Sequence, residues 1–555
     1  MDKKFFIGIA AFLVLGFGIF WLFSSRTSDL SEELEQSLEK NIPGYLVESR
    51  FAEDIREFYQ EREYQEVWFN GKRLSSSGKE LLNQLETIAF EGLQPEDYHW
   101  QDFQFMVSGE KTELGKIKKL NEVELASLEL LMTHAFFTLS KDLEFGKVDP
   151  QSLDANWKFE EKEGEYVYAD LLREVADGAS VEETLEKLNP ELQLYANGRK
   201  AIRDLYELKE KDTLDWSHIT LSEALKVGES HPKVPKLRER LIFWGFLSPY
   251  TVDRPLTFDS KMEAGLKEYQ KSQGMEPDGV IGSLVVSQLN KSPNDLIDLA
   301  AANMERLRWL PSIDWDQEMV LVNVANFQLD YLKKSDTLFT TKVIVGKDYS
   351  ESPSFTAPMS YIVFSPYWNI PPSITHEEII PAIKKNKSYL EQKNMELVDQ
   401  SGELVNSSSV KWEQVDTGEF PYRIRQKPGG SNSLGLVKFM FPNPYNIYIH
   451  DTPNRNLFAK ESRALSHGCI RIQYPDQFAK VLLGDSEWTD EKIQEAMNQQ
   501  NEQSVKLEKS ISVVLLYLTF WSEENGGINY RQDIYGRDEA LIRALKSSKS
   551  SPDQA

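Results

Sequence analysis

Residues 320–332, VLVNVANFQLDYL, decide the fold class of the C-terminal half of the chain, because the spacing of apolar residues changes there. Apolar and polar positions alternate with a period of two, which is typical of β-strands. The same pattern predicts strands in three further stretches, TTKVIVG (340–346), YIVF (361–364) and YNIYIH (445–450). A last strand is predicted in SVVLLYLTFW (512–521). We therefore expect a mostly-β domain over residues 318–525.

One segment interrupts this β pattern. Between residues 373 and 420 a helical pattern returns, in THEEIIPAIKKNKSYLEQKN (375–394), and a polar, Ser-rich stretch follows it. A long excursion between core strands is the usual form of an active-site lid. The sequence therefore predicts an inserted helical cap at residues 373–420.

Upstream of the β domain the apolar spacing is helical. Residues 46–225 carry apolar residues three and four apart, as in ELLNQLETIAFEGL (80–93), and predict a helical scaffold domain. Residues 226–292 predict a small three-helix domain, with Pro277-Asp278-Gly279 as a sharp turn before its last helix. Residues 293–317 predict a linker helix. None of these segments shows a catalytic constellation.

The N-terminal end has the composition of a membrane anchor. Residues 5–23 are all apolar or glycine and follow Lys3 and Lys4. About 20 such residues can cross a bilayer, and the run ends in Trp-Leu-Phe rather than in the small residues of a cleavage site. We expect residues 1–26 to form an uncleaved signal anchor, in preference to a cleaved signal peptide, with the rest exported. Residues 27–45 predict a polar stalk, and residues 526–555 a C-terminal segment and tail.

Composition narrows the class of protein. The 555 residues include 63 Lys and Arg against 88 Asp and Glu, a net charge of −25, which argues against nucleic acid as a partner. The 40% hydrophobic content and 12 Trp are enough for several buried cores, so we expect a multidomain α+β protein. A single cysteine excludes an intrachain disulfide and cysteine-based metal clusters. We expect no cofactor and no metal.

The surroundings of that cysteine indicate chemistry rather than inert packing. It lies in the stretch Ser466-His467-Gly468-Cys469-Ile470-Arg471, and His450-Asp451 ends a predicted strand upstream. A thiol becomes a nucleophile when a base or a positive charge favours its thiolate, and histidine and arginine are both present here. A glycine next to the thiol lets the backbone turn so that amide N–H groups can face a developing oxyanion.

These residues resemble a known signature. His450, followed after a gap of 15 residues by Ser466 to Arg471, resembles the catalytic motif of the YkuD-type L,D-transpeptidases, with Arg471 where other members carry Asn. Other segments resemble the large YcbB-like branch of Gram-negative bacteria: Tyr367–Ile374, Arg425–Gly429, Asn432–Gly435, Val437–Phe439 and Phe441–Asn443. The smaller helical domain resembles peptidoglycan-binding domains of type 1, through Leu266, Lys267, Tyr269, Gln270, Gly274, Asp278-Gly279 and Ile281-Gly282. The predicted order of domains also resembles that branch.

The resemblance implies a role for each site residue. Cys469 is the nucleophile, His450 its base, and the backbone carbonyl of Asp451 orients the imidazole, while the Asp451 side chain caps a loop or strand end. His467 is a second-rank catalytic candidate that tunes the thiol or shapes the pocket. The oxyanion and support residues are Gly468, Ser466, Arg471 and Tyr448, with the N–H groups of Gly468 and Cys469 as oxyanion donors. The substrate-binding candidates are Trp368, Asn369, Asn432 and Phe441. Trp412 is expected to pack in a core rather than to wall the site.

The function implied by the resemblance is peptidoglycan cross-linking. The thiolate attacks the third residue of a donor tetrapeptide stem, D-Ala leaves, and the side-chain amine of an acceptor stem resolves the acyl-enzyme into a 3→3 cross-link. The expected location is the bacterial inner membrane, single-pass, with the C-terminal domains in the periplasm and cell-wall synthesis proteins as further candidate partners. The thiol should also be acylated by carbapenem-like β-lactams.

Two alternatives within the same chemistry stay open. They are an L,D-carboxypeptidase and a transpeptidase that attaches a lipoprotein, because both would share the acyl-enzyme. A third alternative is a wall-binding anchor without activity.

Overall fold

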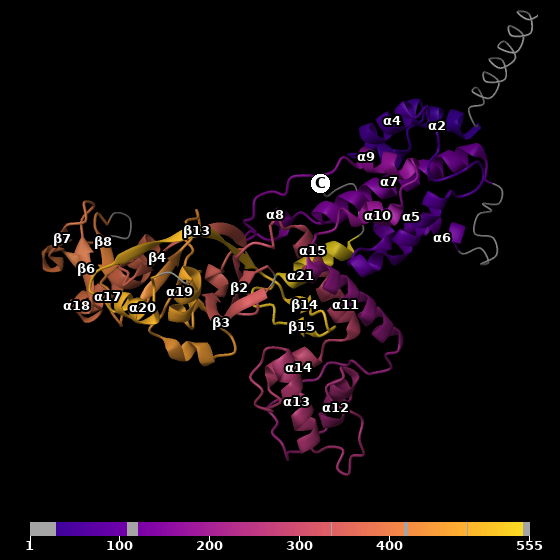
Figure 1. Ribbon diagram of the computed structural model, residues 1–555. Helices are drawn as coiled ribbons and strands as arrows, with labels where there is room; N and C mark the ends of the chain where they lie inside the picture. Colours follow the sequence, from indigo (N-terminus) through magenta and orange to yellow (C-terminus); the bar gives the residue numbers. More distant parts are fainter. Residues whose placement is uncertain (1–28, 108–119, 335, 416–419, 485–486, 548–555) are drawn as a thin grey trace, which may run out of the picture.

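The computed structural model describes residues 29–107, 120–334, 336–415, 420–484 and 487–547 (Figure 1). The predicted anchor at residues 1–26 lies outside these ranges and stays a prediction. Within the described ranges, no helix combines the length and the apolar character needed to span a bilayer.

The N-terminal domain is helical, as predicted for residues 46–225. Its centre is α7 (Glu122–Phe145), which begins in a capping box between Asn121 and Glu124 and is buried along most of its length. The other helices of this half of the chain are α3 (Gly44–Val47), α4 (Ala52–Glu61), α5 (Ser76–Thr87), α6 (Trp100–Val107), α8 (Pro150–Leu153), α9 (Tyr168–Ala176), α10 (Val181–Glu186) and α11 (Gln193–Glu210).

The prediction of a polar stalk at residues 27–45 is wrong for most of that segment. Residues Asp29–Glu39 form helix α2, which packs on α7. Leu30, Leu34 and Leu38 are at most 3% exposed, because their spacing of four places them on one face of the helix. The acidic residues between them masked this short apolar stripe in the sequence.

The small domain has the three predicted helices, α12 (Val234–Phe243), α13 (Ser260–Ser272) and α14 (Ser283–Leu289). The helix after it, α15 (Pro293–Arg308), is more than a linker. It packs between α11 and the C-terminal helix α21 (Asp538–Lys546) at the junction of the domains (Figure 1). Arg308 is fully buried there, between Glu305 at 2.9 Å and the Tyr195 hydroxyl.

The β domain is built on a nine-stranded sheet. Its strand order is β11-β3-β12-β10-β9-β4-β13-β1-β2, and β2 also pairs with β3, so the sheet closes on itself. The bounds are β1 Met319–Asn323, β2 Gln328–Lys333, β3 Asp336–Gly346, β4 Phe355–Phe364, β9 Val437–Met440, β10 Ile449–His450, β11 Ala464–Ser466, β12 Ile470–Ile472 and β13 Gln503–Leu516. Helices α19 (Pro475–Leu483) and α20 (Asp490–Met497) pack on its apolar side.

The insertion between β4 and β9 is a mixed cap rather than the helical one that the sequence predicts. A second sheet, ordered β5-β8-β6-β7, carries its strands. The cap contains β5 (Trp368–Asn369), α16 (Pro372–Ile374), a π-helix (Thr375–Ile379), α17 (Ile380–Lys385), α18 (Tyr389–Gln392), β6 (Met395–Val398), β7 (Leu404–Val405) and β8 (Arg423–Gln426). These strands are four residues or shorter, too short for their alternation to stand out in the sequence.

The C-terminal end also differs from its prediction. The strand expected in residues 512–521 is divided: β13 ends at Leu516, and β14 (Phe520–Ser522) pairs instead with β15 (Ile528–Tyr530). Residues 528–530 and α21 then pack against α15 and α13, through Leu541, Leu545 and a Tyr269–Tyr530 hydroxyl contact of 2.6 Å. Most of the expected tail segment is therefore part of the domain junction.

Candidate active site

The register of two parallel strands brings the predicted catalytic segments together. In the pairing of β10 with β12, Ile449 lies opposite Ile470 and His450 opposite Arg471. Ile449 and Ile470 point into the core, so His450 and Arg471 face the other side of the sheet. Cys469 lies at the bend immediately before β12, beside Tyr448, whose carbonyl accepts the N–H of Ile470 at 3.1 Å.

His450 is buried and uncharged at neutral pH. Its Nδ1 lies 2.5 Å from the carbonyl oxygen of Asp451, the contact that the family resemblance implies for the imidazole. A carbonyl only accepts, so Nδ1 carries the proton and Nε2 is left as the basic nitrogen. Burial, reinforced by the nearby charge of Arg471, lowers the pKa of His450 to about 3.

Cys469 is half-buried and its thiol is protonated at rest. Its Sγ donates to the carbonyl of Asn446 at 3.7 Å. Burial raises the pKa of the Cys469 thiol to about 11, although hydrogen bonds from Tyr448 and the charge of Arg471 both oppose the rise. The resting pair is therefore a neutral thiol and a neutral imidazole, with Arg471 as the cation that favours the thiolate.

The loop that carries the thiol is held by serine hydroxyls. Ser466 Oγ donates to the carbonyl of Cys469 at 2.7 Å and accepts the N–H of Gly468 at 3.1 Å. Gly468 has φ +107°, a conformation that L side chains rarely adopt. The Gly468 N–H is thus bonded within the loop, and its predicted role as an oxyanion donor stays a prediction.

A second buried serine fixes the other side of the same loop. Ser352 Oγ donates to the carbonyl of Gly468 at 2.7 Å and accepts the N–H of Gly346 at 3.0 Å. The Tyr535 hydroxyl accepts the N–H of Ser352 and donates to the carbonyl of Gly346 at 2.7 Å. Ser352 is fully buried, so these bonds are shielded from water and position the backbone beside Cys469.

The Asp451 side chain has the predicted role of a cap at a strand end. Its carboxylate accepts the N–H groups of Leu436 at 2.9 Å and Thr452 at 2.6 Å, and it pairs with Arg455 at 2.5 Å. A Cβ at Gly435 would lie 2.3 Å from the Asp451 Cγ, so only glycine fits there. This packing fixes the residue whose carbonyl contacts His450.

The cap touches the residues around the thiol at two places, Tyr448 and His467. Trp368, in β5, forms a hydrogen bond with the side chain of Tyr448. Burial raises the pKa of Tyr448, and this hydrogen bond opposes the rise. His467 is 41% exposed, and its Nε2 lies 3.1 Å from Glu378 Oε1 in the π-helix of the cap. Asn369, also in β5, is exposed. Cap residues therefore border the thiol through Tyr448 and through His467.

Two predicted substrate-binding residues have structural roles instead. Asn432 is fully buried, and its amide bonds the carbonyls of Pro366 and Lys427 and the N–H of Leu434. Phe441 is fully buried in the core of the β domain, against Phe355. Both predictions are wrong, because a segment resemblance does not show which side of the backbone a residue occupies. Trp412 packs in the cap core beside Phe420, as expected.

Three residues near the site, Ser352, Tyr535 and Glu378, carry no signal in the sequence. None lies in a motif, and each reaches the site from a segment far from residues 450–471 along the chain. A lone serine or glutamate has no sequence signal that separates it from a surface residue. Only the closed sheet and the inserted cap bring these side chains to the loop.

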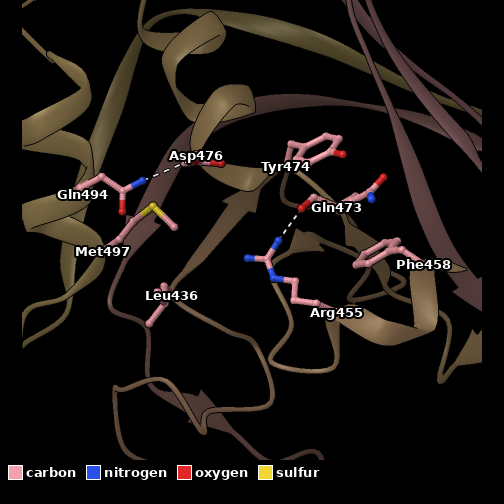
Figure 2. Close-up of a pocket in the computed structure, with 8 residues that line it drawn as sticks. All are labelled: Leu436, Arg455, Phe458, Gln473, Tyr474, Asp476, Gln494 and Met497. Carbon is pink, nitrogen blue, oxygen red and sulfur yellow. Dashed lines mark hydrogen bonds between the residues drawn. The ribbon is translucent and has the colours of Figure 1, made fainter.

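A cavity of about 380 Å³ lies just beyond the carboxyl end of β12, and Figure 2 shows the side chains that line it. It is lined by Leu436, Arg455, Phe458, Gln473, Tyr474, Asp476, Gln494 and Met497. None of these residues was predicted as a site residue. The cavity adjoins the catalytic site because Arg455 contacts the Asp451 carboxylate.

Replacing Ser352 by Ala is expected to destabilise the catalytic domain. The change leaves the carbonyl of Gly468 and the N–H of Gly346 buried without their partner, which costs about 1–3 kcal/mol for a buried polar group. Urea unfolding followed by tryptophan fluorescence should show the loss, with Ser388→Ala, an exposed serine without a capping bond, as the matched control. Equal midpoints for the two variants would contradict the positioning role of Ser352.

Comparison with known families gives each domain a class. Residues 317–491 match the family described as "L,D-transpeptidase catalytic domain" (YkuD). Residues 53–202 match "Scaffold domain", and residues 230–289 match "Putative peptidoglycan binding domain". The chain therefore carries a YkuD L,D-transpeptidase catalytic domain, with a peptidoglycan-binding domain ahead of it.

Three individual proteins are similar to parts of this chain. A Haemophilus influenzae protein named "Putative L,D-transpeptidase" is 36% identical over 241 residues, which are 43% of this chain and 48% of that protein. The chain thus spans about half the length of this curated relative. Solved L,D-transpeptidases of Xylanimonas cellulosilytica and Stackebrandtia nassauensis are 12% and 14% identical, with TM-scores of 0.17 and 0.20. The matches cover 54% and 53% of this chain and 100% and 94% of theirs, and at such TM-scores they have no bearing on its fold.

Proposed function

We propose that this protein forms 3→3 cross-links between peptidoglycan stem peptides through an acyl-enzyme on Cys469. The observation that carries the proposal is the pairing of β10 with β12 inside a YkuD-family domain, which places the chain's one thiol and a buried neutral histidine on neighbouring strands. The peptidoglycan-binding family of residues 230–289 supports a wall substrate.

The first half-reaction acylates the thiol. His450 Nε2 accepts the proton of Cys469 as Sγ attacks the carbonyl carbon of the third stem residue. The negative charge that develops on the carbonyl oxygen is stabilised by the Cys469 N–H and the Tyr448 hydroxyl. The C–N bond to the terminal D-Ala then breaks, the D-Ala nitrogen takes the proton from His450, and a thioester remains.

The second half-reaction transfers the acyl group. The side-chain amine of an acceptor stem attacks the thioester, His450 accepts its proton, and the thiol leaves with a proton restored. No ATP is needed, because the thioester conserves the energy of the donor amide. The cap, which reaches the thiol through Trp368 and His467, has the physical role of excluding water from the thioester.

The roles of the supporting residues follow from their contacts. Arg471 favours the thiolate by charge and Ser466 holds the loop. Trp368 and Asn369 line the donor stem from the cap side. We place the protein in a bacterial inner membrane through residues 1–26, with the remaining domains in the periplasm beside other cell-wall synthesis proteins. Carbapenem-like β-lactams are expected to acylate the same thiol.

The test is a product analysis. The full chain is incubated with a disaccharide-tetrapeptide donor and an acceptor stem, and products are separated by mass. A cross-linked dimer with released D-Ala is expected. Tripeptide without a dimer would identify water as the acceptor and an L,D-carboxypeptidase. A product with a lipoprotein lysine peptide, but none with a stem amine, would identify the lipoprotein-attaching alternative.

The rate of thiol acylation is expected to be nearly independent of pH between about 6 and 9. The thiol, with a pKa of about 11, and the imidazole of His450, with a pKa of about 3, are both neutral throughout this range. The proton passes from one to the other within the reaction, so neither group gains or loses a proton to solvent. The measurement is the rate of the mass shift caused by a carbapenem, and a rate that rises about tenfold per pH unit would show that solvent hydroxide, rather than His450, takes the thiol proton.

A further inference from the structure

The cavity beside the catalytic site has the size and lining of a binding pocket. Its volume of about 380 Å³ falls within the range of small-molecule sites, about 300–1,000 Å³. Apolar side chains, Met497 and Phe458, form part of the wall, and polar side chains converge on the rest (Figure 2). This combination of an apolar wall with a few placed polar groups is typical of a specific ligand site.

The polar groups suit a neutral ligand with many hydroxyls. Gln494 Nε2 donates to Asp476 Oδ2 at 3.2 Å, which leaves further acceptor and donor positions on both side chains. Arg455 is already engaged by the Asp451 carboxylate and by the carbonyl of Gln473, so its charge is compensated. Arg455 is therefore not available to bind the carboxylate of a ligand, and the mixed lining does not favour a wholly apolar ligand.

Tyr474 gives the pocket an exposed aromatic ring. Its side chain is 45% exposed at the rim and makes no capping bond for α19, which it precedes. An aromatic face of this kind packs against the C–H face of a pyranose ring, while nearby amide and carboxylate groups bond the sugar hydroxyls. The chemistry that fits all of these groups together is a sugar residue.

The distance from the thiol agrees with a sugar. Gln473 follows β12 directly, and its N–H still pairs with the carbonyl of Lys342, so the strand conformation continues to the pocket. Gln473 is four positions beyond Cys469, about 13 Å along an extended strand at 3.3 Å per residue. Between the attacked carbonyl and the glycan, a stem peptide has three residues, about 10–11 Å when extended.

We propose that this pocket binds a sugar residue of the glycan strand that bears the donor stem. The inference rests on the proposed function, because it takes the donor stem to run along β12, from the thiol just before its amino end to the pocket just beyond its carboxyl end. The pocket and His450 share the residue Asp451, whose carboxylate holds Arg455 and whose carbonyl holds the imidazole. Occupation of the pocket would then fix the stem with its third carbonyl at Cys469.

The test compares two donors, a free tetrapeptide and the same tetrapeptide on a GlcNAc–MurNAc disaccharide, with the full chain. For the wild type, the disaccharide is expected to raise kcat/KM for cross-linking at least tenfold. In Tyr474→Ala and Gln494→Ala that gain should fall by about tenfold, while the rate with the free tetrapeptide stays unchanged. Gln500→Ala, an exposed glutamine outside the pocket lining, is the control.

Two results would overturn the pocket assignment: an unchanged gain in the pocket variants, or an equal loss with both donors. Absence of cross-linking by the wild type with either donor would instead remove the proposed function. In that case, calorimetry measures the affinity of the protein for the peptide-free disaccharide and so tests the pocket separately. Binding at least tenfold weaker in Tyr474→Ala than in the wild type supports the site, and equal binding overturns it.

Discussion

Cross-linking activity is expected to fall below detection when Cys469 is replaced by Ala. The proposed reaction has no other nucleophile, since the chain has one cysteine, and loss of a nucleophile from a covalent enzyme costs about 10⁴–10⁶ in kcat. The measurement is the yield of cross-linked dimer, together with the mass adduct of a carbapenem, which should also disappear.

The same variant separates catalysis from wall binding. Cys469 is half-buried, donates one long hydrogen bond and accepts weak ones from Tyr448, so its replacement should shift the unfolding midpoint by only a few degrees. Sedimentation with peptidoglycan sacculi should be retained, because the peptidoglycan-binding domain lies at residues 230–289. Full activity in Cys469→Ala, or a wild type without any β-lactam adduct, would favour the wall-binding anchor.

His450→Gln is expected to lower kcat by about 10²–10⁴, the usual contribution of a positioned general base. The amide cannot accept the thiol proton as the imidazole does, although it can retain a bond to the Asp451 carbonyl. The loss should be partly recovered above pH 9, because hydroxide then supplies the thiolate directly. The measurement is the pH profile of carbapenem acylation for the variant and the wild type.

The matched control for this variant is His467→Gln. His467 is 41% exposed and contacts Glu378 at the surface, where even a full ion pair is usually worth less than 1 kcal/mol. We therefore expect its rate to stay within about threefold of the wild type. A His450→Gln rate equally close to the wild type, or His467→Gln as the more impaired variant, would show that the base has been assigned to the wrong histidine.

The sequence by itself determined the class of each domain. Alternation in residues 320–332 predicted the β domain, helical spacing predicted the scaffold, and the motif around Cys469 predicted the YkuD catalytic domain that residues 317–491 match. These signals are local, because strand alternation, helix periodicity and a catalytic loop each occupy a short run of the chain.

Only the tertiary structure decided which side chains face the site. Burial of Asn432 and Phe441, the engagement of the Gly468 N–H by Ser466, and the bond from Ser352 to Gly468 depend on how distant segments pack. The helix at Asp29–Glu39 likewise owes its place to the apolar surface of α7. The physical reason is that burial and hydrogen bonding depend on contacts between segments far apart in the chain, whereas a sequence pattern records only the periodicity of one segment.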